Sequence, residues 1–98
     1  MTPKTIKIIG KRYKIIKRKD FENYGESDEQ KQTIKLREDM LPDLELDTFI
    51  HEVTHAIDHQ MSLKMSERQV HGVGAGLAAV LIDNPKLLNY LQELISGE

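Results

Sequence analysis

Hydrophobic and polar residues alternate over the first part of the chain, as they do in half-buried β-strands. Ile6 and Ile8 flank a lysine, and the alternation resumes after a turn that begins at Gly10. Glycine supplies the backbone angles that tight hairpin turns require. The pattern predicts a β-hairpin over residues 5–17 and, where the alternation returns, a third strand over residues 33–37.

The spacing of apolar residues changes to three and four in the second half of the chain, which is the period of an α-helix. A helix is predicted over residues 48–61, with its apolar face on the core. That face consists of Ile50, Val53, Ile57 and Met61. Asp47 is the predicted N-cap, because its carboxylate can accept a hydrogen bond from the first free N–H groups. The polar segments before it, residues 20–31 and residues 39–47, are predicted to be a loop and a connection.

Two further helices are predicted toward the end of the chain. Ser66 is the N-cap candidate of a helix that reaches about Asp83, and Pro85 suits the first position of a third helix. The third helix carries an apolar stripe made of Leu87, Leu88, Leu91, Leu94 and Ile95. The second contains Gly72, Gly74 and Gly76, which predict close approach of another helix, because glycine otherwise weakens a helix.

The order of these elements, strands first and helices afterwards, predicts an α+β fold in which a small three-stranded N-terminal sheet precedes three helices. A chain of 98 residues suits a single domain over residues 1–98. With 39% hydrophobic and 31% charged residues, the composition is that of an ordinary globular domain.

Charge and cysteine content narrow the possible partners and compartment. The formal net charge of −2 gives no overall attraction to nucleic acid. Basic residues do cluster over residues 4–19, but they alternate with apolar ones as a solvated strand face would, so no nucleic-acid partner is expected. The chain has no cysteine, which excludes disulfides and thiolate metal sites and fits a cytoplasmic protein. No apolar run approaches the ~20 residues that span a membrane, so no membrane partner is expected.

The segment His51-Glu52-Val53-Thr54-His55 carries the chemistry, because it matches the pattern H-E-x-x-H. Residues four apart project from one face of a helix, so the two imidazoles can share a metal ion. Glu52 is turned about 100° from His51, which places it beside the metal as a base rather than as a ligand. Nitrogen ligands of this kind favour zinc, and a metal-activated water beside a carboxylate favours hydrolysis.

The chain resembles the very small zincin-type metallopeptidases of phages, prophages and bacteria, which are related in plan to the ImmA/IrrE peptidases. The resemblance is carried by Thr-Phe-Ile-His-Glu-Val-Thr-His-Ala-Ile-Asp, by Met-Ser-Glu-Arg-Gln-Val and by Leu-Ala-Ala-Val-Leu-Ile-Asp-Asn-Pro. It implies a minimal zincin-like domain with a small sheet, an active-site helix and a second helix that delivers an acidic third metal ligand. It also implies a zinc metallopeptidase of the gluzincin kind.

The third ligand has two candidates on the second predicted helix. Glu67 is preferred, because a carboxylate suits zinc beside two imidazoles and the Ser-Glu pair matches the small phage proteins. His71 is the alternative, because the rise of two antiparallel helices would bring it to the level of His55. His59 lies one further turn along and is expected at the surface or near the ligands, and Asp58 is a candidate partner of a ligand imidazole.

The predicted function is therefore zinc-dependent hydrolysis of peptide bonds, with Glu52 as the general base. Its peptide or protein substrate is expected to pair as an extended strand with residues 33–37. The alternative is a catalytically silent interaction module that zinc stabilises, because a small domain can gain folding free energy from a metal. The sequence leaves the substrate, the oligomeric state and the native metal open.

Overall fold

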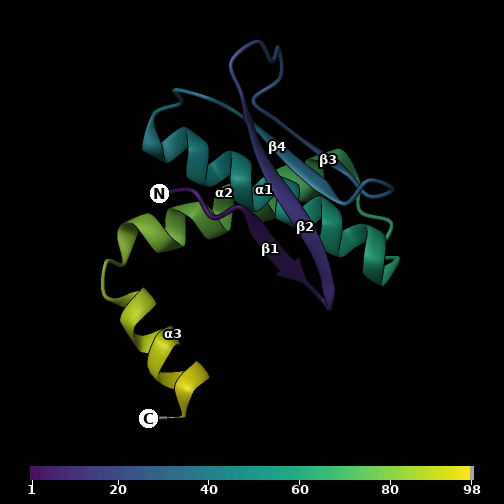
Figure 1. Cartoon of the computed structure of the whole chain (residues 1–98). Helices are drawn as coiled ribbons and strands as arrows, with labels where there is room; N and C mark the ends of the chain where they lie inside the picture. The colour runs from purple at the N-terminus through teal and green to yellow at the C-terminus, as the bar shows by residue number, and fades with distance from the viewer. Residues whose placement is uncertain (98) are drawn as a thin grey trace.

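The computed structural model describes residues 1–97 of the chain, which form a mixed sheet and helices (Figure 1). In chain order they are β1 (Thr5–Ile8), β2 (Lys11–Arg18), β3 (Gly25–Asp28), β4 (Thr33–Arg37), α1 (Pro42–Met61), α2 (Glu67–Asp83) and α3 (Leu87–Ser96). The predicted α+β class is confirmed. Within the described residues, no helix is both long enough and apolar enough to cross a membrane.

The sheet has four strands, not the three that were predicted. Its order is β1-β2-β4-β3, with β2 and β4 parallel and the outer pairs antiparallel. The β1–β2 hairpin is confirmed. Its two turn residues, Ile9 and Gly10, both have positive φ angles of 47° and 82°, which is the backbone of a tight two-residue hairpin turn.

The additional strand is β3, which lies in the segment predicted to be a loop. Its sequence, Gly-Glu-Ser-Asp, contains none of the branched or aromatic residues that favour strands. Pairing with β4 satisfies its backbone nevertheless. Because β3 occupies this place, β4 is an inner strand, and the expectation that a substrate pairs with residues 33–37 is wrong. The sheet edge beside β4 belongs to β3.

Helix α1 is six residues longer at its start than predicted, since it begins at Pro42 rather than Thr48. Proline suits the first position of a helix, where its missing N–H has no partner to lose. Leu41 is therefore the N-cap, and the predicted cap Asp47 lies inside the helix. The predicted cap of α2 is confirmed: Ser66 and Gln69 bond each other's backbone N–H groups in a capping box.

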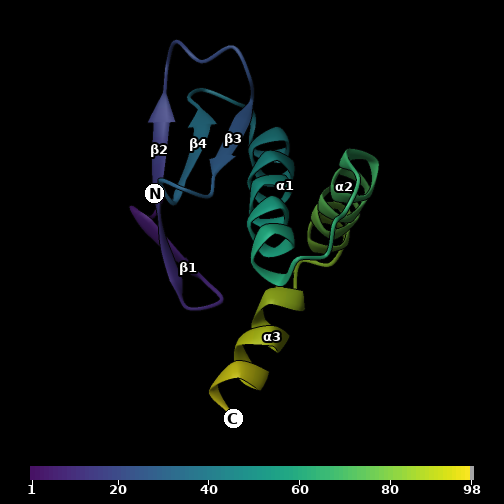
Figure 2. The ribbon, with the colours of Figure 1, turned by 90° about the vertical axis from the view of Figure 1, so that its right-hand side faces the viewer.

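The molecule is layered, with α1 between the sheet and α2 (Figure 2). The core under the sheet contains the buried side chains Ile8, Tyr13, Ile34, Leu36 and Ala56, with Phe49, Val53 and Ile57 packed against them. Met61, which was predicted to face the core, is exposed. On the other side of α1, α2 turns Val70, Gly74 and Ala78 inward. The sheet and α2 thus cover two sides of α1, and the side chains of the two motif histidines remain partly exposed.

Candidate metal centre

The two motif histidines lie one turn apart on α1, where Gly74 of α2 approaches the backbone of His51. Their rings are 4.9 Å apart between centroids and meet edge to face. Their side chains are 20% and 30% exposed, so the imidazoles are held by their surroundings but remain accessible. The helical spacing that was read from the sequence therefore places His51 and His55 side by side.

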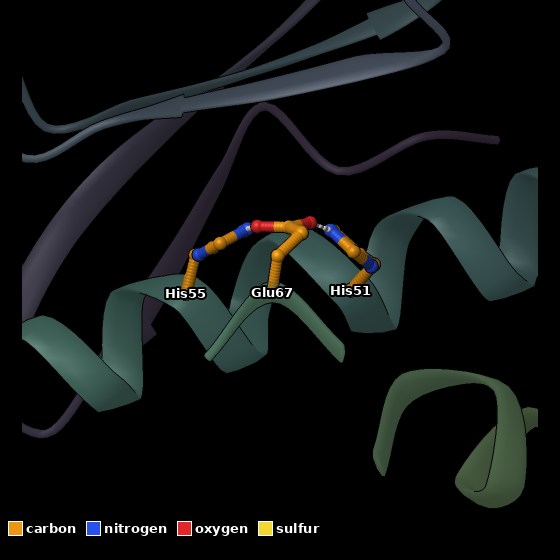
Figure 3. Close-up of side chains that lie close together, drawn as sticks. All are labelled: His51, His55 and Glu67. Atoms are coloured by element: carbon orange, nitrogen blue, oxygen red, sulfur yellow. Dashed lines mark ion pairs between the residues drawn. The ribbon is translucent and has the colours of Figure 1, made fainter. Parts of the chain in front are cut away.

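Glu67, the first residue of α2, completes the group (Figure 3). One of its carboxylate oxygens, Oε1, lies 2.9 Å from His51 Nε2, and the other, Oε2, lies 3.2 Å from His55 Nε2. The three donor groups each present an atom within 4.8 Å of the others. Among the described residues, this is the group of histidine and carboxylate side chains that could hold a metal ion.

The donor set fits zinc in both chemistry and spacing. Zinc takes imidazole nitrogen and carboxylate oxygen at roughly 2.0–2.2 Å, and in a tetrahedral site such ligands stand about 3.3 Å from one another. The two contacts of Glu67 are close to that separation. An ion between these atoms would draw the three donor atoms, which lie within 4.8 Å of one another, closer together, and the 71% exposed Glu67 side chain has room to shift.

His71, the alternative third ligand, does not join this group. Its ring centroid is 6.2 Å from that of His51, and it lines a separate cleft with Glu52. The linker explains why Glu67 lies closer than rise arithmetic suggests. Ser62 and Lys64 both adopt positive φ angles, and this backbone returns the chain toward His55 before α2 begins.

Two neighbouring side chains, His59 and Asp58, lie outside the group formed by His51, His55 and Glu67. His59 is exposed, as expected. Asp58 accepts a hydrogen bond from the backbone N–H of Met65 at 3.1 Å, so its carboxylate ties down the linker that delivers Glu67.

Glu52 lies beside the histidines but points toward β3. It is 6% exposed, and burial raises the pKa of its carboxyl to about 7. The positive character of His55 opposes this rise in pKa, whereas the negative charge of Glu67 adds to it. A carboxyl group whose pKa is near neutrality can both accept and return a proton at physiological pH.

Gly25, in β3, lets the edge strand approach Glu52. A Cβ atom at this position would stand 2.6 Å from the Thr48 methyl and 3.1 Å from the Glu52 side chain, so any other residue would force these side chains to shift. Sequence reasoning missed this contact. The signal available was weak, because a lone glycine in a polar segment is typical of a loop.

Two open clefts meet at Glu52. One, of about 750 Å³, is lined by Tyr24, Arg37, Leu44 and His71 among others. The second, of about 510 Å³, is lined by residues of β3, by Glu67 and by both motif histidines. Gly25, His51 and Glu52 border both clefts. The two clefts therefore adjoin along β3 at Glu52.

Comparison of the chain with models of protein families finds no match, and searches of curated proteins and of solved structures also find none. Any statement of function therefore rests on the residues and their geometry.

Proposed function

We propose that the protein is a zinc metallopeptidase with a minimal zincin-like fold. The observation that carries the proposal is the position of the Glu67 carboxylate between His51 Nε2 and His55 Nε2, with the buried carboxyl of Glu52 alongside. His-His-Glu is a ligand set of catalytic zinc sites, which keep one position open for water or substrate. A closed structural site would need a fourth protein ligand, and the described residues offer three.

Each side chain has a role in this proposal. His51, His55 and Glu67 would hold zinc, which when bound supplies Lewis acidity that activates water and polarises a carbonyl. Glu52 takes the proton from the attacking water and gives it to the leaving amine nitrogen. His71 faces the reacting carbonyl from the larger cleft and donates a hydrogen bond to its oxygen as negative charge develops.

The substrate is an extended peptide that pairs with β3. The edge of β3 lies beside the site, and the clefts on both sides of Glu52 include its residues. Backbone hydrogen bonds to an edge strand hold a peptide regardless of its sequence, while the clefts receive its side chains. The scissile bond then lies over Glu52.

Metal content and cleavage of a mixed peptide library test the proposal together. Purified protein should bind one zinc ion per chain, and His51→Ala should lose it. Glu52→Gln should retain zinc but cleave at least about 100-fold more slowly, because general base catalysis contributes roughly 10²–10⁴ in rate. The matched control is Asp43→Asn, which alters an exposed carboxylate in the first turn of α1, outside both clefts, and should cleave normally.

The outcomes separate metal binding from catalysis. Absence of zinc from the protein would contradict the whole proposal. Stoichiometric zinc with no cleavage by the wild type, or with equal cleavage by Glu52→Gln, would contradict the catalytic part and favour the zinc-stabilised interaction module.

A further inference from the structure

Helix α3 extends away from the sheet and from the other two helices (Figures 1 and 2). None of its residues is buried. It is nevertheless strongly amphipathic, because Asn89, Gln92, Glu93 and Ser96 lie on one side and all its large apolar residues on the other. We define the α3 stripe as Leu88, Tyr90, Leu91, Leu94 and Ile95, whose exposed fractions range from 38% to 80%.

An isolated helix of this kind is not stable in water. Helices shorter than about 12–15 residues are marginal without tertiary packing, and α3 has 10 residues. Its N-cap, Lys86, makes no side-chain capping hydrogen bond that would compensate. A helix this short gains its stability from packing, so the exposed stripe is suited to being covered by another surface.

A second uncovered apolar surface lies on α2. We define the α2 patch as Val73, Gly76, Leu77 and Val80, which follow one another at helical spacing on the side of α2 next to the one formed by the buried residues Val70, Gly74 and Ala78. The three large residues are 43–50% exposed. No charged residue occurs in α2 between His71 and Asp83, so this face carries no charge that would keep it in water.

Gly76 has no side chain and therefore leaves a shallow depression in the middle of the α2 patch. A Cβ atom there would meet nothing within 4 Å in the chain, in contrast to Gly74, whose added Cβ would stand 3.1 Å from the His51 backbone. Glycine inside a helix costs about 0.5–1 kcal/mol against alanine. Close approach between helices within the chain, predicted for all three glycines, accounts for Gly74 but leaves Gly72 and Gly76 unexplained, and of these two Gly76 lies in the α2 patch.

We propose that the α2 patch and the α3 stripe form the interface of a homodimer, in which α3 of each chain packs against α2 of the other. The two surfaces are complementary, since one offers bulky leucine side chains and the other a depression at Gly76. Both lie on the same chain, and a two-fold axis lets each copy cover the other's exposed surface without leaving either free.

The exposed area of the α2 patch and the α3 stripe is large enough for an interface with a second copy of the chain. The side chains of the patch and the stripe together expose on the order of 800 Å², and each partner in a stable interface of standard size contributes about 800 Å². A membrane surface is a poorer fit, because helices that lie on membranes carry lysine and arginine on their polar face, and α3 has none.

The dimer leaves the metal centre open. Glu67 and Val73 are six residues apart on α2 and point about 120° from each other. The interface and the candidate metal ligands therefore occupy different sides of α2, so dimerisation can be tested without reference to zinc or to cleavage.

Sedimentation of the full chain at a series of concentrations tests the proposal. The wild type should have twice the mass of one chain at about 100 µM and dissociate on dilution. Leu94→Asp in α3 and Leu77→Asp in α2 should each weaken the dimer at least 100-fold. Gln92→Asp introduces the same residue on the polar side of α3 and should leave dissociation within a few-fold of wild type. Amide hydrogen exchange in β4 checks that the core of every variant remains folded.

Three results would overturn the proposal. The first is a wild-type chain that remains monomeric at about 100 µM, as it would if α3 folded back onto its own α2. The second is a dimer that survives either aspartate substitution in the α2 patch or the α3 stripe. The third is a monomer that binds vesicles of neutral or anionic phospholipid.

Discussion

The two sides of α2 contrast sharply. The inner side packs on α1 through Val70, Gly74 and Ala78, and every one of these residues is buried. The outer side carries Val73, Leu77 and Val80 in the open. The inner side brings Glu67 to the histidines and thereby forms the candidate metal centre. The outer side is free to contact another chain, so one helix can serve a site and an interface without coupling them.

The largest expected effect is on stabilisation by zinc, and it should distinguish Glu67 at the candidate metal centre from Glu93 on α3. Zinc that binds only the folded state should raise the free energy of unfolding by about 4 kcal/mol at a thousandfold excess over its dissociation constant. Glu67→Gln should remove most of that gain, whereas Glu93→Gln should retain it. Thermal unfolding with zinc and with chelator measures both. An equal response to zinc in the two variants would show that Glu67 is not a ligand.

The pH dependence of stability should depend on Glu52. Its pKa is raised in the folded protein from 4.5 to about 7 by burial. The stability associated with this protonated carboxyl is therefore fully present below pH 4.5 and is lost as pH rises through 7.

In metal-free protein, Glu52→Gln should thus raise the free energy of unfolding by about 2–3 kcal/mol at alkaline pH. The difference from wild type should vanish near the carboxyl's ordinary pKa. Urea unfolding with chelator at the two pH values measures this change. For the exposed control Asp43→Asn, the difference in stability from wild type should not change between the two pH values. A Glu52→Gln effect that is the same at both pH values would refute the explanation.

Close packing around the site should make β3 intolerant of even one methyl group. Gly25→Ala should lower the free energy of unfolding by about 1–3 kcal/mol, the usual cost of overpacking, because the new Cβ meets the Thr48 methyl. Thr48→Ser removes that methyl and keeps the hydroxyl, so the double variant should recover part of the loss. A double variant no more stable than Gly25→Ala would show that this contact is not the cause.

The smallest effect compares two glycines of α2, Gly72 and Gly74, that are separated by a single residue. Gly74→Ala should push α2 from the His51 backbone, lower stability by about 1 kcal/mol and weaken zinc binding several-fold. Gly72→Ala meets nothing within 4 Å and should stabilise the helix by roughly 0.5–1 kcal/mol with zinc affinity unchanged. Calorimetric titration and urea unfolding measure both quantities. Similar behaviour of the two variants would remove the distinction between the sides of α2.

The sequence alone determined those features that depend on neighbours along the chain. Helical spacing placed His51 and His55 on one face, and the Ser66 cap set the start of α2, because hydrogen bonds and side-chain directions within a helix are local. Alternation found β1, β2 and β4 for the same reason.

Tertiary structure decided what depends on contacts between distant segments. β3 has no strand-favouring residues and exists because β4 pairs with it, and that pairing displaces β4 from the edge. Metal chemistry favours Glu67 over His71 in the sequence, but its position against both histidines depends on the path of the linker and the approach at Gly74. Burial beside β3, which raises the pKa of Glu52, likewise arises only when residues 25 and 52 meet. The motif thus specifies two candidate ligands on one helix, while the fold supplies the third candidate and the environment of Glu52.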